Sequence, residues 1–388
     1  MTLRVEECLP AIDRATLTPR VQRALNSETV ELNDWTLQPI HSGFEVRAGV
    51  YRLIGRAHDH ERAVPWSLIL KIVRPAPGSS EDDPHDWNYL KRDALAYQSS
   101  LLADLPGGLA APRCFAVLEQ AEGEIWIWLE EVRDDIGSKW PLLRYGLAAR
   151  HLGRFNGAYL NGRSLPHWPW LSREWLRVLV TQAAPAMAQL PSVLNHPLLC
   201  RLYPDDVAEG IFRLWADREP LLSALDRLPR TFCHRDAFRR NLFARRGADG
   251  QEQTVAIDWV FAGAGAIGEE AVAPVAATLG FREVDLAEAA ELEKVVFENY
   301  LAGLRDSGWE GDSRLARFGY AAAAPLRYCL GGTRNLLPVM LDESQHPRFE
   351  KMWGDPIHVY ADYWARMFRY LLTLADEARG LLRMMDAW

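Results

Sequence analysis

The chain lacks the features of secreted, membrane-spanning and nucleic-acid-binding proteins. No stretch approaches the ~18 uninterrupted apolar residues of a membrane span, and the N-terminus has no basic start followed by an apolar core. The five cysteines are scattered without CxxC spacing, which predicts reduced thiols. A formal net charge of -8 argues against a nucleic-acid partner, because phosphate backbones require a basic surface. We therefore expect a cytoplasmic protein with no membrane and no nucleic-acid partner; composition leaves its oligomeric state open.

The most informative segment is 231–241, with the sequence TFCHRDAFRRN. His234, Asp236 and Asn241 reproduce the spacing H-x-D-x-x-x-x-N, which is typical of the catalytic loop of phosphoryl-transfer enzymes. Asp and Asn are also common turn formers, so a purely structural role for Asp236 and Asn241 is the alternative. The pattern alone is moderately specific, and its surroundings decide how much weight it carries.

A second carboxylate follows this segment on the next apolar run. The apolar runs 241–244 and 254–257 flank a turn rich in glycine and aspartate, which predicts a β-hairpin. Such a hairpin would return Asp258 to the side of Asn241. An Asp carboxylate and an Asn carbonyl are hard oxygen ligands of the kind that Mg²⁺ prefers.

The chemistry of phosphoryl transfer explains these residue types. Catalysis is mostly positioning and neutralisation of phosphate charge, so a metal site and a base are the main requirements. Asn241 and Asp258 are the predicted metal ligands, and Asp236 is the predicted base that accepts the proton of an acceptor hydroxyl. His234 is expected to brace the loop by hydrogen bonding rather than to react.

The sequence HRDAFRRNLF followed by AIDW resembles the aminoglycoside phosphotransferase and choline kinase branch of the protein-kinase-like superfamily. The resemblance implies an α+β bilobal protein-kinase-like fold with a small antiparallel β-sheet lobe and a larger, mostly helical lobe. We expect an N-terminal extension, helical in part, at 1–36, a nucleotide-binding lobe at 37–133 and a helical lobe with the catalytic loop and acceptor site at 134–388. The 388 residues and 48% hydrophobic content suffice for two cores.

The resemblance also implies ATP and Mg²⁺ as cofactors, and upstream residues to hold the nucleotide. Lys71 lies within the apolar run 66–73, and an embedded lysine requires an anion, here the α and β phosphates. A lysine on an edge strand, pointing to water, is the alternative. The run 87–102 has helical spacing and carries Asp93 where the family has a Glu that pairs with the lysine. An exposed position for Asp93 is nearly as consistent with the sequence.

Two further segments resemble the family's nucleotide site. The run 40–54 resembles the hairpin that covers the phosphates, and Gly43 gives its turn backbone freedom. The run 125–132 resembles the last strand of the small lobe and the hinge. Glu130 and Val132 would then form the main-chain hydrogen bonds to adenine.

Candidate substrate contacts follow from position. The adjacent carboxylates of Glu269 and Glu270 could bind an amino group of the acceptor, or could stabilise a helix N-terminus. Within the catalytic loop, either Arg239 or Arg240 approaches the transferred phosphate, or both are surface charges. The negative net charge fits a neutral or amine-bearing substrate.

These residues predict an ATP-dependent kinase that phosphorylates a hydroxyl of a small molecule. A catalytically silent nucleotide-binding module is the alternative, although its usual sign, loss of Lys71 or of the loop and metal residues, is absent. A protein kinase is a weaker alternative, because Trp259 and not Phe-Gly follows Asp258. The sequence does not distinguish antibiotics, choline-like amines, sugars and other alcohols as acceptors.

Overall fold

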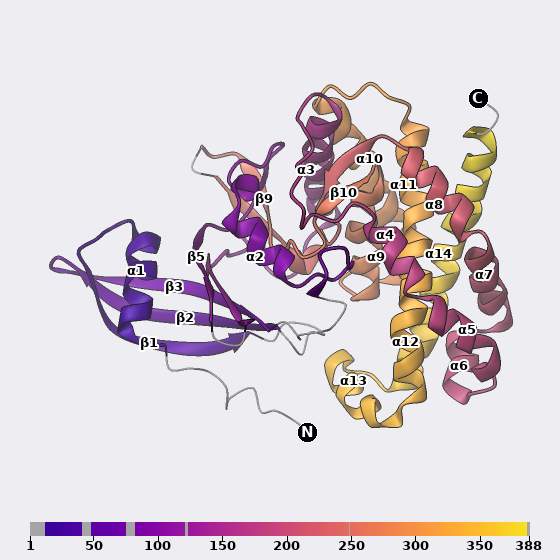
Figure 1. Cartoon of the computed structure of the whole chain (residues 1–388), viewed down its shortest axis with the longest axis horizontal. Coiled ribbons are helices and arrows are strands. Elements are labelled where there is room, and N and C mark those ends of the chain that lie inside the picture. The colour runs from indigo at the N-terminus through magenta and orange to yellow at the C-terminus, as the bar shows by residue number, and fades with distance from the viewer. Residues whose placement is uncertain (1–11, 41–47, 75–81, 121–122, 248, 386–388) are drawn as a thin grey trace.

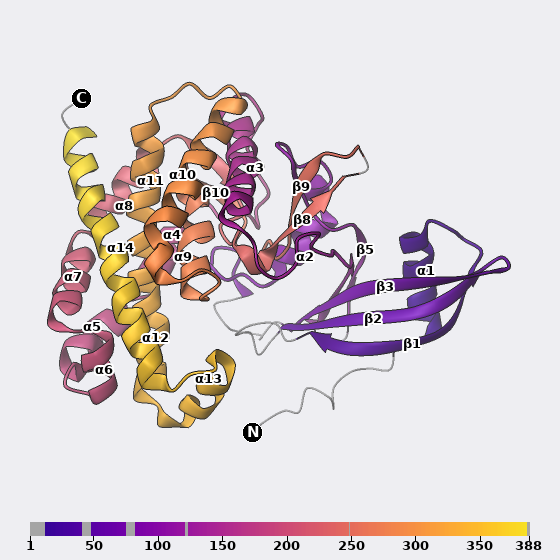
Figure 2. The same cartoon turned by 180° about the vertical axis from the view of Figure 1, so that it is seen from behind.

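The chain folds into two lobes, one built on a β-sheet and one mostly helical (Figure 1). The computed structural model describes residues 12–40, 48–74, 82–120, 123–247 and 249–385. The large sheet lies at one end of the molecule and most of the helices lie at the other, as the view from behind also shows (Figure 2). The predicted α+β bilobal fold is confirmed.

The small lobe is an antiparallel sheet of five strands in the order β1-β2-β3-β6-β5. The strands are β1 (Val30–Ile40), β2 (Ala48–Asp59), β3 (Arg62–Val73), β5 (Cys114–Glu119) and β6 (Ile125–Glu130). Lys71 on β3 lies opposite Val50 of β2 and Ile127 of β6. β3 is therefore the central strand, as the apolar run around Lys71 predicts, and the edge-strand alternative is wrong.

Residues 12–36 contribute to this lobe. Helix α1 (Arg14–Leu25) packs on the sheet, and its Leu17 and Val21 are buried in the same hydrophobic cluster as the strand residues. β1 begins at Val30, ahead of the lobe boundary expected at residue 37. We expected residues 1–36 to be an extension outside the lobe. Their described part instead supplies helix α1 and the start of the edge strand β1.

Helix α2 (Lys91–Gln98) is shorter than the run 87–102 that has helical spacing. The guanidinium of Arg92 is fully buried and donates hydrogen bonds to the main-chain carbonyls of Pro84 and Asp86. A buried guanidinium needs such acceptors, because an unpaired charge costs several kcal/mol. These bonds hold the chain before α2 in a turn, so the helix begins later than its periodicity predicts.

The large lobe consists of helices packed around one hydrophobic core, as expected. They are α3 (Leu142–Leu160), α4 (Trp175–Thr181), α5 (Ala184–Val193), α6 (Pro197–Leu202), α7 (Asp205–Ala216), α8 (Arg218–Arg227), α9 (Val272–Gly280), α10 (Ala289–Asp306), α11 (Ser313–Pro325), α12 (Gly331–Leu341), α13 (His346–Trp353) and α14 (Ile357–Met385). A π-helical segment, Leu326–Leu330, joins α11 to α12. None of the helices in the described ranges combines the length and the hydropathy of a membrane span.

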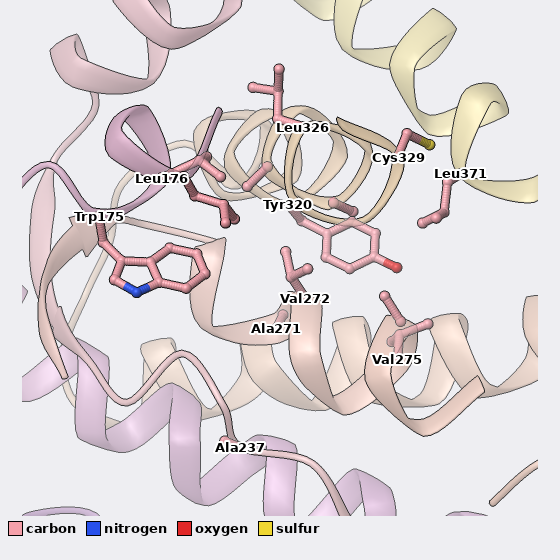
Figure 3. Close-up of a cluster of buried hydrophobic side chains, with 14 of the residues drawn as sticks. Trp175, Leu176, Ala237, Ala271, Val272, Val275, Tyr320, Leu326, Cys329 and Leu371 are labelled. Atoms are coloured by element: carbon pink, nitrogen blue, oxygen red, sulfur yellow. The ribbon is translucent and has the colours of Figure 1, made fainter. Parts of the chain in front are cut away.

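Part of this core lies directly behind the catalytic loop. Figure 3 shows Trp175 of α4, Val272 and Val275 of α9, Tyr320 of α11 and Ala237 of the loop in one buried cluster. Ala237 and Tyr320 are fully buried. The loop is thus anchored on packed helices, which is the rigid support that an active site requires.

Short strands frame the catalytic loop. They are β4 (Leu109–Ala110), β7 (Arg230–Cys233), β8 (Leu242–Arg246), β9 (Glu252–Ala256) and β10 (Gly263–Ala266). β8 and β9 form an antiparallel pair, with Leu242 opposite Ala256, so the predicted hairpin is confirmed. The N–H of Ile257 donates to the carbonyl of Asn241 at 3.0 Å. The hairpin therefore returns the chain to the side of Asn241, just before Asp258.

Candidate functional site

The carboxylate of Asp236 lies at the centre of the candidate site. Its Oδ2 accepts a hydrogen bond from Nδ2 of Asn241 at 2.7 Å, and its Oδ1 accepts one from Nη2 of Arg327 at 2.9 Å. Burial raises the pKa of Asp236 to about 6, although the cationic Arg327 acts in the opposite direction. A carboxylate with a pKa near neutrality and a fixed orientation is suited to accept a proton.

His234 holds the loop from beneath. Its ring is fully buried, with Nε2 at 2.9 Å from the carbonyl oxygen of Ile257 and Nδ1 at 3.1 Å from the N–H of Asp236. Burial lowers the pKa of His234 to about 4, so the ring is neutral. The neutral ring donates from Nε2 and accepts at Nδ1, which ties the loop to the end of the hairpin and leaves no nitrogen for catalysis.

Lys71 joins the two lobes at the site. Its Nζ lies 2.8 Å from Oδ2 of Asp93 and 2.9 Å from Oδ1 of Asp258. Asp93 is buried on α2, and its Oδ1 accepts the N–H of Trp259 at 2.8 Å. The structure thus forms the pair between Lys71 and Asp93 despite the shorter Asp side chain, and it excludes an exposed position for Asp93.

Asp258 follows Ile257, whose N–H bonds to the carbonyl of Asn241, and its carboxylate contacts Lys71. Its φ of 65° lies in the left-handed region, where a non-glycine residue is uncommon and its backbone is strained. The partial burial of Asp258 alone would raise the pKa of its carboxyl, but the adjacent Lys71 outweighs this effect and lowers the pKa. A carboxylate that stays ionised is a suitable metal ligand.

The donor set at this place fits Mg²⁺. Among the described residues, no group of three or more His, Cys, Asp or Glu side chains gathers as a self-contained metal site. Mg²⁺ is usually held by one or two carboxylates together with substrate phosphates and water, and not by an all-protein cage. The side chain of Asp258 is 35% exposed, so it is open to such a ligand, and the amide nitrogen of Asn241 is engaged by Asp236. The amide oxygen of Asn241 is then the atom that remains for a metal.

The expectation that Glu269 and Glu270 contact an amino group of the substrate is wrong. Both side chains are buried behind the catalytic loop. Glu270 accepts the N–H groups of His234 and Arg235 at 2.6 and 3.1 Å, and Glu269 accepts the N–H of Ala266 at 3.0 Å. Burial raises the pKa of Glu270 to about 7, against the effect of its two N–H donors. Glu270 therefore fixes the backbone of the loop, and Glu269 fixes the end of β10.

Arg239 neither approaches the place of a transferred phosphate nor lies at the surface, so both expectations are wrong for this residue. Its guanidinium is buried, donates to the carbonyl of Leu242 at 3.0 Å and lies over the ring of Trp140. It is neither a surface charge nor placed to reach a phosphate. Arg240 is exposed and pairs with Glu283 at 2.6 Å, which agrees with the surface alternative.

The predicted hinge follows β6. Glu130 is the last residue of that strand and lies opposite Leu68 of β3, and Val132 follows in an irregular segment. Leu129 is buried against the large-lobe cluster, so this edge of the sheet meets the other lobe. Gly43 lies outside the described residues.

Sequence reasoning missed Arg327. It lies in the π-helical segment, far along the chain from Asp236, and it also donates to the carbonyl of Arg235. Its guanidinium lies over the rings of Trp175 and Tyr328, at 4.8 and 4.9 Å from their centroids. A π-helical turn often marks a functional site, but no local sequence pattern identifies this one.

A cavity of about 590 Å³ opens beside Asp236 and Arg327. Small-molecule sites commonly have ~300–1,000 Å³. The walls come from α4, the catalytic loop, α9, the π-helical segment, α12, α13, the start of α14 and the segments around Trp87 and Phe261. The arrangement therefore places a candidate base at the edge of a space large enough for a small organic molecule.

Comparison with solved structures gives several similar folds. The amicoumacin kinase hAmiN, in complex with AMP-PNP, Ca²⁺ and Ami, has 15% sequence identity and a TM-score of 0.52 over 89% of this chain and 88% of that chain. An apo thermostable mutant of the aminoglycoside phosphotransferase APH(4)-Ia has 15% identity and a TM-score of 0.46, with 91% of this chain and 97% of that chain covered. The spectinomycin phosphotransferase APH(9)-Ia, in complex with ADP and spectinomycin, has 13% identity and a TM-score of 0.47, with coverage of 87% and 94%.

No family model matches the sequence, and no curated protein sequence matches it. The likeness to the amicoumacin kinase nevertheless extends through both lobes, because it covers nearly the whole of each chain. The kinase-like fold that the catalytic-loop pattern predicts is thereby confirmed.

Proposed function

We propose that this chain, which shares its fold with a small-molecule kinase, transfers the γ-phosphoryl group of ATP to a hydroxyl of a small molecule. The observation that carries the proposal is the position of Asp236. Its carboxylate borders the cavity and is held by Asn241 on one oxygen and by Arg327 on the other. The complex of the similar amicoumacin kinase with AMP-PNP and Ca²⁺ supports a nucleotide and a divalent metal.

The residues divide the work as follows. Asp236 accepts the proton of the acceptor hydroxyl as that oxygen bonds to the γ-phosphorus, and the bond from the γ-phosphorus to the bridging oxygen breaks to release ADP. Asn241 and Asp258 would hold Mg²⁺, which when bound neutralises phosphate charge. Lys71, oriented by Asp93, would contact the α and β phosphates.

The adenine end of the nucleotide would lie at the hinge, where Glu130 and Val132 would form its main-chain hydrogen bonds. Gly43 would lie in the turn that covers the phosphates. The size of the cavity beside Asp236 favours a small acceptor over a protein substrate. The presence of the base, the lysine and both metal ligands argues against a silent nucleotide-binding module.

The proposal is tested by following ADP release from ATP and Mg²⁺ across a panel of hydroxylated small molecules. At least one acceptor is expected to raise ADP formation well above the rate with water alone. An acceptor-dependent rate that is unchanged in the Asp236→Asn variant would contradict the proposed site. Failure of ATP and Mg²⁺ to raise the thermal midpoint would contradict nucleotide binding itself.

The pH dependence of the reaction should report the state of Asp236. Because burial raises its pKa to about 6, kcat/KM is expected to fall about tenfold per pH unit below that value, as the base becomes protonated. Arg327 favours the ionised carboxylate, so Arg327→Gln should move this acidic limb to higher pH. The titration of ATP affects both profiles equally and cancels in their difference. A limb that stays in place, or that moves to lower pH, would contradict this role of Arg327.

A further inference from the structure

The cavity beside Asp236 has many aromatic residues in its walls. One wall is a run of stacked rings: Phe238 of the catalytic loop stacks on Phe281 at 4.9 Å and 12°, and Phe281 stacks on Trp353 of α13 at 5.6 Å and 25°. A second aromatic group contains Phe261, which lies 5.3 Å from Trp87 and 5.1 Å from Trp175. All these rings line the cavity. Such a lining favours a flat apolar body, because pairs of aromatic rings attract each other beyond the effect of the area that they bury.

The charged residues that line the cavity do not favour the binding of a polycation. Among the described residues that line it, Asp236 is the one carboxylate, and Arg327 already pairs with it. The other charged residue of the lining is Arg348, which is exposed at the α13 end of the cavity. A cationic acceptor would therefore meet a second arginine and no available carboxylate, and like charges disfavour binding.

Three acidic residues close to the cavity in sequence, Glu283, Glu350 and Asp355, are engaged elsewhere. Glu283 pairs with Arg240, and Asp355 pairs with Arg282. The carboxylate of Glu350 accepts the N–H of Ile357 at 2.8 Å at the start of α14. None of these three side chains lines the cavity. The chain as a whole is negatively charged, but the charged residues that line this cavity are one aspartate and two arginines.

The hydroxyl of Tyr328, in the cavity lining, could bind an oxygen of an uncharged ligand. The hydroxyl oxygen of Tyr328 is buried and has no hydrogen-bond partner within the described part of the chain. A buried hydroxyl without a partner is unfavourable, so a ligand oxygen that reached it would stabilise the complex. Tyr328 lies beside Arg327 in the π-helical segment, close to the base.

We infer that the acceptor is a hydroxylated compound with a flat aromatic or similarly apolar body and no positive charge, and that a carboxylate on it is favoured by Arg348. This inference rests on the proposed function, because it concerns the acceptor of that same site. It replaces the expectation of an amine-bearing substrate, which relied on the net charge and on the buried pair Glu269 and Glu270. It also predicts that this pocket does not favour a polycationic antibiotic as acceptor.

Calorimetric binding to the full-length protein, without nucleotide, tests the inference separately from catalysis. The probes are 4-methylumbelliferyl β-glucoside, which is neutral with a flat ring, its glucuronide, which adds a carboxylate, and the cationic hygromycin B and spectinomycin. Both umbelliferyl compounds are expected to bind at least tenfold more tightly than both cationic probes. Tighter binding of either cationic probe, or no detectable binding of either umbelliferyl compound, would overturn the inference.

A charge reversal tests the role of Arg348. Arg348→Glu should lower the ratio of glucuronide to glucoside affinity at least tenfold, because it replaces attraction with repulsion at the cavity. Arg366→Glu is the matched control, since Arg366 is an exposed arginine on α14 that does not line the cavity. An unchanged ratio in Arg348→Glu, or an equal change in Arg366→Glu, would overturn the assignment of Arg348.

Failure of the two proposals is distinguishable. Selective binding of the umbelliferyl compounds without ADP release in the presence of ATP and Mg²⁺ would contradict the kinase function and leave the pocket inference in place. ADP release that only a cationic acceptor stimulates would overturn the pocket inference and support the kinase. Selective binding together with ADP release would support both.

Discussion

Replacing Asp236 with asparagine is expected to lower kcat on the order of 10²- to 10⁴-fold, the range that general-base catalysis typically contributes. Asparagine keeps the size of the side chain and an oxygen for Asn241 or Arg327 to contact, but it cannot accept a proton. The measurement is the steady-state rate of ADP formation with the best acceptor of the panel. Because the loss is in the chemical step, binding of the acceptor should change much less than kcat.

A matched variant makes this result specific. Asp206 is an exposed aspartate on α7 that pairs with Arg369 at 2.6 Å and does not line the cavity beside the candidate base. Asp206→Asn makes the same chemical change and is expected to leave kcat unaltered, since exposed ion pairs contribute ~0–1 kcal/mol to stability. Wild-type circular dichroism and thermal midpoint in Asp236→Asn would show that the fold is intact. A folded Asp236→Asn variant with kcat within tenfold of wild type would exclude Asp236 as the base.

Asp258→Asn is expected to weaken magnesium-dependent nucleotide binding on the order of 100-fold or more, as loss of a ligand should exceed the 10- to 100-fold typical of losing a ligand's supporting partner. The variant removes the carboxylate charge that faces both the proposed metal and Lys71, whose Nζ lies 2.9 Å away. Lys71 keeps its second partner, Asp93, so the small-lobe side of the site should persist.

Thermal shift provides the readout that is independent of turnover. AMP-PNP with Mg²⁺ should stabilise the wild type more than AMP-PNP alone, because a ligand that binds only the folded state raises the midpoint. In Asp258→Asn the added effect of Mg²⁺ should disappear, while Asp206→Asn should behave as the wild type. An equal magnesium-dependent shift in Asp258→Asn and wild type would exclude Asp258 as a metal ligand.

The local parts of the site could be predicted from the sequence because they are encoded within a short stretch. The spacing of His234, Asp236 and Asn241 identifies the loop. Two apolar runs on either side of a glycine-containing turn identify the hairpin that follows. Its register places Leu242 opposite Ala256, which brings the chain back beside Asn241. The central strand around Lys71 is similarly local, because a nearly continuous apolar run is typical of a strand buried on both faces.

The parts that depend on packing between distant elements could not be predicted. Arg327 reaches Asp236 only because the π-helical segment lies against the catalytic loop. Glu269 and Glu270 read as a charged pair at a helix start, and only the tertiary fold buries them behind the loop. Periodicity likewise could not show that Arg92 holds the preceding turn and so delays the start of α2.

Phosphorus NMR of a reaction containing the protein, ATP, Mg²⁺ and the best acceptor tests phosphoryl transfer to a hydroxyl most directly. We expect a new phosphomonoester signal, coupled to the carbon-bound protons of the acceptor, that grows in step with ADP and is absent with Asp236→Asn. ADP accompanied only by inorganic phosphate, or a phosphomonoester formed equally by Asp236→Asn, would contradict a kinase that uses Asp236 as its base.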